Sequence, residues 1–177
     1  MRGELFRDRV DAARRLAEAL AGYRGRNPLV LAIPRGAVPM AKIIAAELGG
    51  ELDVVLVRKL RAPGNPEFAL GSVDETGWAY LAEHARHYAS EEYLEREKRA
   101  QLEVIRGRRA RYTPIHPPVD PAGRVVIVVD DGLATGSTMI SALHALRARG
   151  AGTLVCAVPV SPPDTLEVVR QYADETV

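Results

Sequence analysis

The sequence lacks the features that mark several classes of protein. Its 177 residues include one cysteine, so no intramolecular disulfide can form, which favours a reducing compartment. The formal net charge is +1, which gives no electrostatic reason to expect nucleic acid as the main partner. No apolar run approaches the roughly 18 residues that a membrane span needs, and Met1–Phe6 lacks the apolar stretch of a signal peptide. These absences predict a cytoplasmic protein that does not enter the membrane.

Common catalytic and nucleotide-binding patterns are also missing. The four histidines show no metal-ligand spacing and no nucleophile partner. Cys156 lies in the apolar run Leu154–Val158, which predicts a buried core residue rather than a nucleophile. Neither G-x-x-x-x-G-K-[ST] nor G-x-G-x-x-G occurs, which excludes a P-loop and the dinucleotide fingerprint.

The segment Val125–Thr138, called the signature segment below, carries most of the information. Val125–Val129 is short, apolar and rich in β-branched residues, which predicts a buried strand. Asp130 and Asp131 follow where the strand ends, and then comes a turn of small and hydroxyl residues. In open α/β sheets, ligands bind at this end of the strands. The amides of such a turn suit a phosphate, whereas the two acids suit sugar hydroxyls or a metal ion, so a ribose with a 5′-phosphate would satisfy both.

The signature segment resembles the phosphoribosyl-diphosphate (PRPP) binding signature of type I phosphoribosyltransferases. The resemblance implies that Asp130 and Asp131 hold the ribose hydroxyls and, directly or through water, Mg²⁺. It also implies that the turn binds the 5′-phosphate. The alternative is an ordinary strand–turn–helix. Ala134 stands where enzymes for 6-oxopurines commonly carry an aspartate, and the loop is closer to adenine-type enzymes, so the resemblance identifies the donor but not the acceptor. The phosphate-binding residues expected in the turn are Ala134, Thr135, Gly136, Ser137 and Thr138.

Two further loops are expected on the same rim. Ile33–Ala37 resembles the family's diphosphate-binding loop, with Gly36 allowing close backbone approach and Arg35 contacting phosphate. The resemblance predicts an unusual peptide bond near Pro34–Gly36; the alternative is a simple turn. Val57–Glu67 resembles the flexible loop that closes over the site, and Arg58 and Lys59 would bind diphosphate there, with Lys59 as the catalytic-site cation. The alternative is a solvated charged turn.

The coarse secondary structure predicts an α/β fold, a doubly wound and mostly parallel sheet with a small helical or hairpin hood. We expect one domain over residues 1–177, with residues 74–123 as the hood or flap insertion and a C-terminal piece missing after Asp174–Val177.

Ser161 either contacts an acceptor or begins a helix capped by Asp164. The expected strands and helices are Arg7–Leu20 (helix), Leu29–Ile33 (strand), Val38–Leu48 (helix), Leu52–Val57 (strand), Arg58–Phe68 (loop), Ala69–Val73 and Gly77–Leu81 (hairpin), Ser90–Arg111 (helix), Thr113–Gly123 (connector), Thr138–Arg149 (helix), Thr153–Val160 (strand) and Asp164–Tyr172 (helix).

The resemblance implies Mg²⁺-dependent transfer of a 5-phosphoribosyl group from PRPP to a nitrogen acceptor, a nucleobase, with release of diphosphate. This is a glycosyltransferase reaction of nucleotide metabolism. The alternative is a regulatory protein that binds PRPP or a nucleotide without useful turnover. Such a regulator would need a nucleic-acid surface, which the arginines of Arg96–Arg111 could supply, although interspersed glutamates weaken that hypothesis. The long helix Ser90–Arg111 is expected to serve as a hood or homodimer element, or as a solvated cover helix.

Overall fold

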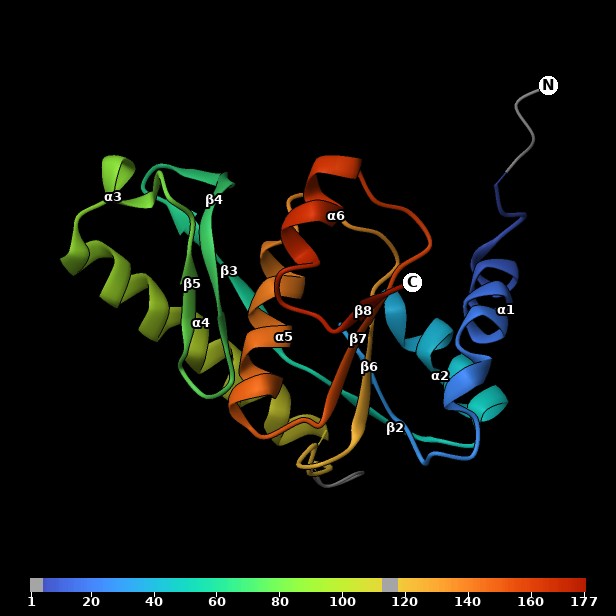
Figure 1. The fold of residues 1–177 in the computed structure, drawn as a ribbon. Helices are drawn as coiled ribbons and strands as arrows, with labels where there is room; N and C mark the ends of the chain where they lie inside the picture. Colours follow the sequence, from blue (N-terminus) through green and yellow to red (C-terminus); the bar gives the residue numbers. More distant parts are fainter. Residues whose placement is uncertain (1–4, 113–117) are drawn as a thin grey trace.

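The computed structural model describes residues 5–112 and 118–177, and these form a five-stranded sheet beside a three-stranded one (Figure 1). The larger sheet has the order β2-β1-β6-β7-β8. Every pair of neighbours in it is parallel, as the expected doubly wound fold requires. The smaller sheet, β3-β4-β5, is antiparallel. The elements are α1 (Arg9–Ala19), η1 (Ala21–Tyr23), β1 (Leu29–Ala32), α2 (Ala37–Leu48), β2 (Glu51–Val54), β3 (Val57–Ala62), β4 (Asn65–Asp74), β5 (Ala79–Leu81), α3 (Ala85–Tyr88), α4 (Glu91–Tyr112), β6 (Val125–Val129), α5 (Ser137–Ala148), β7 (Thr153–Ala157), α6 (Pro163–Val169) and β8 (Glu175–Thr176).

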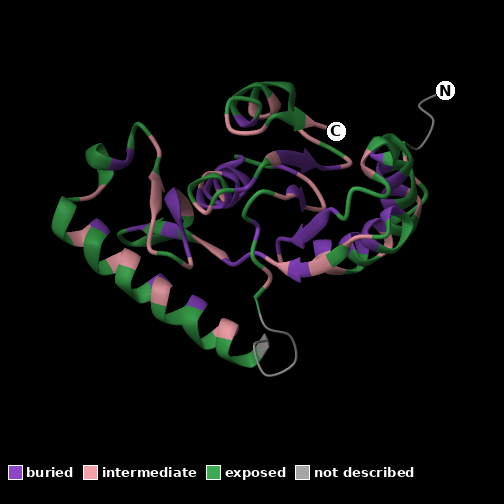
Figure 2. Cartoon of the chain, turned by 60° about the horizontal axis from the view of Figure 1, so that its bottom comes forward, coloured by how far each residue is buried: buried purple, intermediate pink, exposed green. Residues whose placement is uncertain are grey.

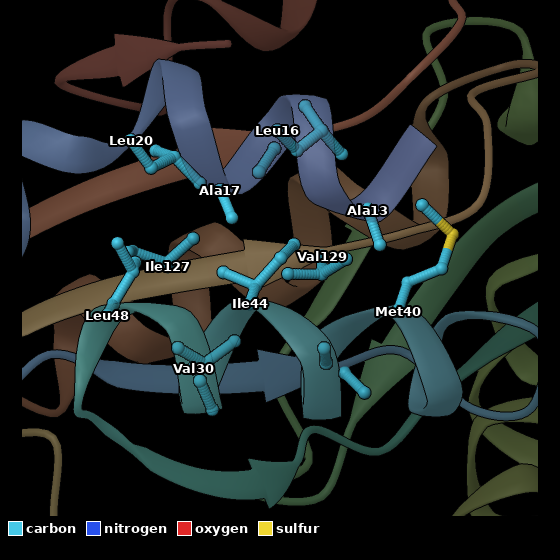
Figure 3. Close-up of a cluster of buried hydrophobic side chains, with 14 of the residues drawn as sticks. Ala13, Leu16, Ala17, Leu20, Val30, Met40, Ile44, Leu48, Ile127 and Val129 are labelled. Atoms are coloured by element: carbon cyan, nitrogen blue, oxygen red, sulfur yellow. The ribbon is translucent and has the colours of Figure 1, made fainter. Parts of the chain in front are cut away.

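The parallel sheet has an apolar core on each face, because successive strand side chains point to opposite sides. Val30, Ile127 and Val129 face α1 and α2 (Figure 3). The intervening Val126 and Val128 pack instead with α5 and with Val169 of α6. A strand covered on both faces must be apolar throughout, which explains the uninterrupted run of Val125–Val129. Cys156 of β7 is fully buried, as expected, and burial raises the pKa of its thiol to about 12.

The antiparallel sheet corrects one expectation. Arg58–Phe68 was expected to be a loop, but it forms most of β3, a tight turn and the start of β4. Its proline and glycine residues mark only the turn, while Leu60 and Ala62 alternate with exposed residues and are buried against α4 and β4. The expected hairpin between Ala69–Val73 and Gly77–Leu81 is confirmed by the pairing of β4 with β5. The second sheet therefore begins at Val57, before the hood boundary expected at residue 74.

The long helix α4 covers the outer side of this second sheet. Ser90 caps it, since the Ser90 hydroxyl accepts a hydrogen bond from the Tyr93 amide at 3.1 Å. Ile105 and Leu94 face the sheet, and the opposite face of the helix is exposed (Figure 2). Residues 113–117 of the expected connector lie outside the described residues. In the described parts of the chain, no helix is both long and apolar enough to cross a membrane.

The C-terminal segment pairs with the main sheet. β8 lies parallel to β7, with Val155 opposite Glu175. The expectation that Asp164 caps the last helix is wrong, because α6 begins at Pro163 and Asp164 lies inside its first turn. Proline is well suited to that first helical position, because its missing N–H would have no partner there.

Candidate functional site

A cavity of about 680 Å³ opens between the two sheets, at the carboxyl end of β6. One wall consists of Asp130–Thr138, the end of the signature segment, with the next residue, Met139, and with Ile33 and Pro34. We call this the signature wall. The other, which we call the hairpin wall, comes from the β3–β4 hairpin and α4. In Figure 1 the β3–β4 turn and the β6–α5 connection both lie toward the upper end of the molecule. The hairpin wall consists of Val57, Arg58, Lys59, Arg61, Pro66, Glu67 and Arg108.

The turn between β6 and α5 has the geometry of an anion site. Gly136 adopts φ +78°, a left-handed conformation that glycine accepts without a steric penalty, and α5 begins at the next residue. The Thr135 and Ser137 hydroxyls lie 3.2 Å apart, and the Thr165 hydroxyl of α6 donates to the Ala134 carbonyl at 2.9 Å. The first amides of a helix point outward and carry partial positive charge. The turn can therefore bind a phosphate.

A buried serine ties this turn to the second sheet. The Ser72 hydroxyl, fully buried in β4, donates to the Ser137 carbonyl at 2.7 Å. The same hydroxyl lies 2.6 Å from the Ser141 hydroxyl, one turn further along α5. Ser72 has a single proton, which goes to the carbonyl, so Ser141 is the donor in the second bond. The first turn of α5 is thus held by a strand of the neighbouring sheet.

The two adjacent acids have different environments. Asp130 is partly buried, and this burial raises the pKa of its carboxyl to about 6, although its hydrogen bond from the Asp131 amide and the nearby Lys59 oppose the rise. The Asp131 side chain is 35% exposed, and its Oδ2 accepts a hydrogen bond from the Arg9 guanidinium of α1 at 2.9 Å. Both acids line the cavity and are half-buried, and they differ in that burial raises the pKa of Asp130 whereas Asp131 pairs with Arg9.

The loop after β1 lies directly against Asp131. A Cβ atom placed on Gly36 would come within 2.3 Å of Asp131 Oδ2, so only glycine allows this approach. The Pro34–Arg35 peptide bond is cis, which confirms the unusual peptide expected in this loop. Pro34 lines the cavity, whereas Arg35 is exposed and is not among the lining residues. The structure thus brings Gly36 to the acids but leaves the Arg35 side chain in solvent.

The hairpin wall is rich in cations. Lys59 and Arg61 come from β3, and Arg108 reaches the cavity from α4. Arg58 donates from Nε to Gln101 Oε1 at 2.9 Å, and burial together with the guanidinium groups of Arg108 and Arg61 lowers its pKa. Within residues 5–112 and 118–177, none of these four cations forms an ion pair, although many other arginines in that part of the chain do. Four cations against the single carboxylate of Glu67 give this wall an excess of positive charge, which favours an anionic ligand.

Most of the sequence-predicted site residues therefore line one cavity. These are Asp130, Asp131, Arg58, Lys59, Ala134, Thr135, Gly136, Ser137 and Thr138. Ser161 is not among the lining residues, and its hydroxyl bonds locally to the Pro162 carbonyl. Sequence reasoning missed Arg9, Glu67 and Arg108 as site residues. Arg9 and Arg108 lie on helices remote in sequence, and only Glu67 had a local signal, its place in the expected flexible loop.

The acid pair suits a magnesium ion that arrives with its ligand. Across the described ranges, no group of three or more His, Cys, Asp or Glu residues could hold a metal by itself. Mg²⁺ commonly keeps several waters and binds through one or two carboxylates plus substrate phosphates. Asp130 and Asp131 supply two carboxylates, and the phosphate-binding turn beside them would bring the phosphate of the ligand close.

Comparison with known proteins agrees with this geometry. A family model described as "Phosphoribosyl transferase domain" matches residues 2–177. A Mycobacterium tuberculosis (strain H37Rv) protein named "Putative phosphoribosyl transferase" is 39% identical over 176 residues, 98% of this chain and 40% of its own length. The chain therefore spans less than half of that curated relative.

Solved structures share the fold. The crystal structure of the protein TT1426 from Thermus thermophilus is 48% identical, with a TM-score of 0.81, and the match covers 97% of this chain and 82% of that one. A hypoxanthine-guanine phosphoribosyltransferase from Bacillus anthracis shares the fold at 13% identity and a TM-score of 0.50, over 89% of this chain and 68% of its own. With its signature wall, its parallel sheet and a family match over almost its whole length, the chain belongs to the phosphoribosyl transferase family.

Proposed function

We propose that this chain transfers the 5-phosphoribosyl group of PRPP to a nitrogen acceptor, a nucleobase, and releases diphosphate. The observation that carries this proposal is the placement of an acid pair and a phosphate-binding turn in one cavity, opposite four cations that form no ion pair with any residue the structure describes. PRPP has a ribose diol, a 5′-phosphate and a diphosphate, and each has a chemically complementary partner in that cavity. The lone buried cysteine is compatible with the cytoplasmic setting in which such a reaction would run.

Each part of the site has a role in this proposal. Ala134–Thr138 bind the 5′-phosphate through backbone amides and hydroxyl groups. Asp130 and Asp131 accept hydrogen bonds from the ribose hydroxyls and stabilise positive charge that develops at the anomeric carbon. Gly36 lets the loop backbone approach the diphosphate, and Lys59 with Arg58 neutralises it as it leaves. Bound Mg²⁺, held by Asp130 and Asp131 directly or through water, would add further charge neutralisation on the phosphate oxygens.

The arrangement of α4 favours a transferase over a regulator that binds nucleic acid. Arg109 forms an ion pair with Glu75 at 2.9 Å, and Arg106 pairs with Glu103 at 2.8 Å. Lys98 pairs with Glu95, and Arg108 faces the cavity. Much of the positive charge of this helix is therefore already neutralised or directed at the proposed active site.

The proposal is tested by diphosphate release from Mg²⁺–PRPP with a panel of purine and pyrimidine bases. We expect release that depends on one base or a small group of bases, and that falls at least 100-fold in Asp131→Asn. Glu83→Gln, an exposed change outside the cavity, should leave the rate unchanged. PRPP binding without release by any base would contradict the transferase proposal and favour the regulatory alternative.

A further inference from the structure

The ion pair between Arg9 and Asp131 joins two distant parts of the chain. Arg9 is the first residue of α1, and its Nη2 lies 2.9 Å from Asp131 Oδ2, across 122 positions of sequence. The N-terminal end of a helix carries partial positive charge, so an arginine there gains nothing from the helix dipole. The position of this guanidinium is therefore better explained by the acid that it contacts than by the helix that carries it.

The same carboxylate oxygen meets the loop after β1. A Cβ atom on Gly36 would lie 2.3 Å from Asp131 Oδ2, and the helix α2 begins at the next residue. Gly36 has no side chain that could cap the first amides of α2, and such amides can bind an anion. Arg9, Asp131 and the start of α2 therefore meet beside the cavity, at the loop to which the proposed function assigns diphosphate.

The ion pair of Arg9 is exposed enough to open. The side chains of Arg9 and Asp131 are 68% and 35% exposed. The ion pair between Arg109 and Glu75 is different, because its side chains are only 15% and 22% exposed and two nitrogens of Arg109 donate to Glu75. Exposed ion pairs are weak, since water and salt screen them. The Arg9–Asp131 pair can therefore open at little cost when a competing charge arrives.

Arg9 and a divalent cation would serve the same acid. Asp130 and Asp131 are adjacent carboxylates that repel each other when both are charged. Over residues 5–112 and 118–177, Arg9 is the one cation that forms an ion pair with either acid. A divalent cation at Asp131 would also neutralise this charge, and it would repel the guanidinium. The two cations therefore compete for Asp131, and a displaced Arg9 would be left next to the diphosphate loop.

We propose that Arg9 exchanges its partner during donor binding, an inference that rests on the proposed function. In the free protein the Arg9 guanidinium neutralises Asp131. When Mg²⁺–PRPP binds, the Asp131 carboxylate turns to the metal ion and the Arg9 guanidinium turns to the diphosphate oxygens. Only ionic contacts change, and no covalent bond forms or breaks. Arg9 thereby opposes the binding of metal alone and favours the binding of metal that arrives with PRPP.

The exchange predicts two changes of opposite sign in Arg9→Ala. Binding of Mn²⁺ alone, used in place of Mg²⁺ and measured by electron paramagnetic resonance, should become roughly three- to fivefold tighter, because no guanidinium competes. Binding of Mg²⁺–PRPP, measured by calorimetry, should become roughly five- to tenfold weaker, because diphosphate loses a cation. Both changes should shrink at high salt.

Two further variants serve as controls for this test. Arg14→Ala removes another exposed arginine of α1, one that forms no ion pair with the residues described, and it should leave both affinities unchanged. Arg9→Lys keeps the charge without the planar fork of the guanidinium, so it should retain part of each effect.

Three results would overturn the inference. An unchanged Mn²⁺ affinity in Arg9→Ala would show that Arg9 does not compete for Asp131. Changes of the same sign in both affinities, or an unchanged affinity for Mg²⁺–PRPP, would show that Arg9 does not pass to diphosphate. If the unaltered protein does not bind PRPP, the proposed function fails and the exchange fails with it, whereas a failure of the exchange alone leaves PRPP binding intact.

Discussion

The two walls of the cavity are built in different ways. The signature wall comes largely from one continuous segment, and its strand is buried on both faces by helices. The hairpin wall is assembled from β3, β4 and α4, whose cavity residues extend from Val57 to Arg108 in the sequence. The first wall carries the groups suited to the donor, and the second carries unpaired cations and Glu67. The proposed donor site is thus encoded largely in one segment, whereas the hairpin wall depends on tertiary packing.

The largest effect should come from Asp130, the half-buried acid of the signature wall whose pKa is raised. The Asp130 pKa is raised from 3.8 to about 6, so the charged form is disfavoured in the folded protein, and stability falls as pH rises through that window. At neutral pH the cost is up to about 3 kcal/mol. Asp130→Asn should therefore raise the free energy of unfolding by roughly 1–3 kcal/mol in urea titrations, while diphosphate release falls at least 100-fold. Asp131, which is half-buried and paired with Arg9, should lower activity without this gain when it is changed to Asn. If Asp130→Asn and Asp131→Asn change the free energy of unfolding equally, Asp130 does not carry the extra stability cost that its raised pKa predicts.

The next effect concerns the contact between the loop after β1 and Asp131. Gly36→Ala places a methyl group against Asp131 Oδ2, the end of a movable side chain, so the fold should tolerate it while the carboxylate shifts. We expect PRPP affinity to fall by roughly tenfold, with unfolding free energy changed by less than about 1 kcal/mol. Gly22→Ala, where nothing lies within 4 Å of the added atom, is the matched control. Unchanged PRPP affinity in Gly36→Ala would mean that this approach is unimportant for binding.

A smaller effect tests the link between the walls. Ser72→Ala removes the donor to the Ser137 carbonyl and leaves buried polar groups of α5 with fewer partners. This should cost about 1–3 kcal/mol of stability and should raise the KM for PRPP more than it lowers kcat, because the phosphate-binding turn is loosened. Ser161→Ala, outside the cavity, should do neither. A loss of stability with an unchanged KM would show that Ser72 supports the fold without positioning the turn.

The smallest effect concerns the cation contributed by α4. Arg108→Ala should weaken the binding of Mg²⁺–PRPP or acceptor by about 3–10-fold, and the loss should shrink as salt screens the charge. Arg106→Ala, an exposed change two positions away, should have little effect because its ion pair with Glu103 is at the surface. If Arg108→Ala and Arg106→Ala bind Mg²⁺–PRPP and acceptor equally well, the cation of α4 does not contribute to ligand binding.

The sequence predicted some segments of the fold and the site well and others poorly, and the local residue pattern explains the difference. Val125–Thr138 combines a short apolar run, an acid pair and small residues in one segment, so its strand, turn and helix were predicted within one or two residues. The β3–β4 hairpin was expected as a loop because Pro63 and Gly64 dominate the local pattern, whereas its pairing depends on distant packing with α4 and α5. Arg9 and Arg108 could not be predicted as site residues. No local sequence pattern indicates that the fold brings Arg9 to Asp131 or Arg108 to the cavity. Gly36 was predicted through family resemblance to bind diphosphate, and this stays a prediction. The structure adds that a Cβ atom at this position would meet Asp131 Oδ2.

The central claim is that the signature wall binds PRPP through Asp131 and the turn that follows it. Calorimetry of Mg²⁺–PRPP with the unaltered protein and with Asp131→Asn tests it most directly, since no acceptor is needed. The account predicts one PRPP bound per chain, with affinity at least tenfold weaker in the variant. Absence of PRPP binding by the folded, unaltered protein, or equal affinity in both proteins, would contradict it.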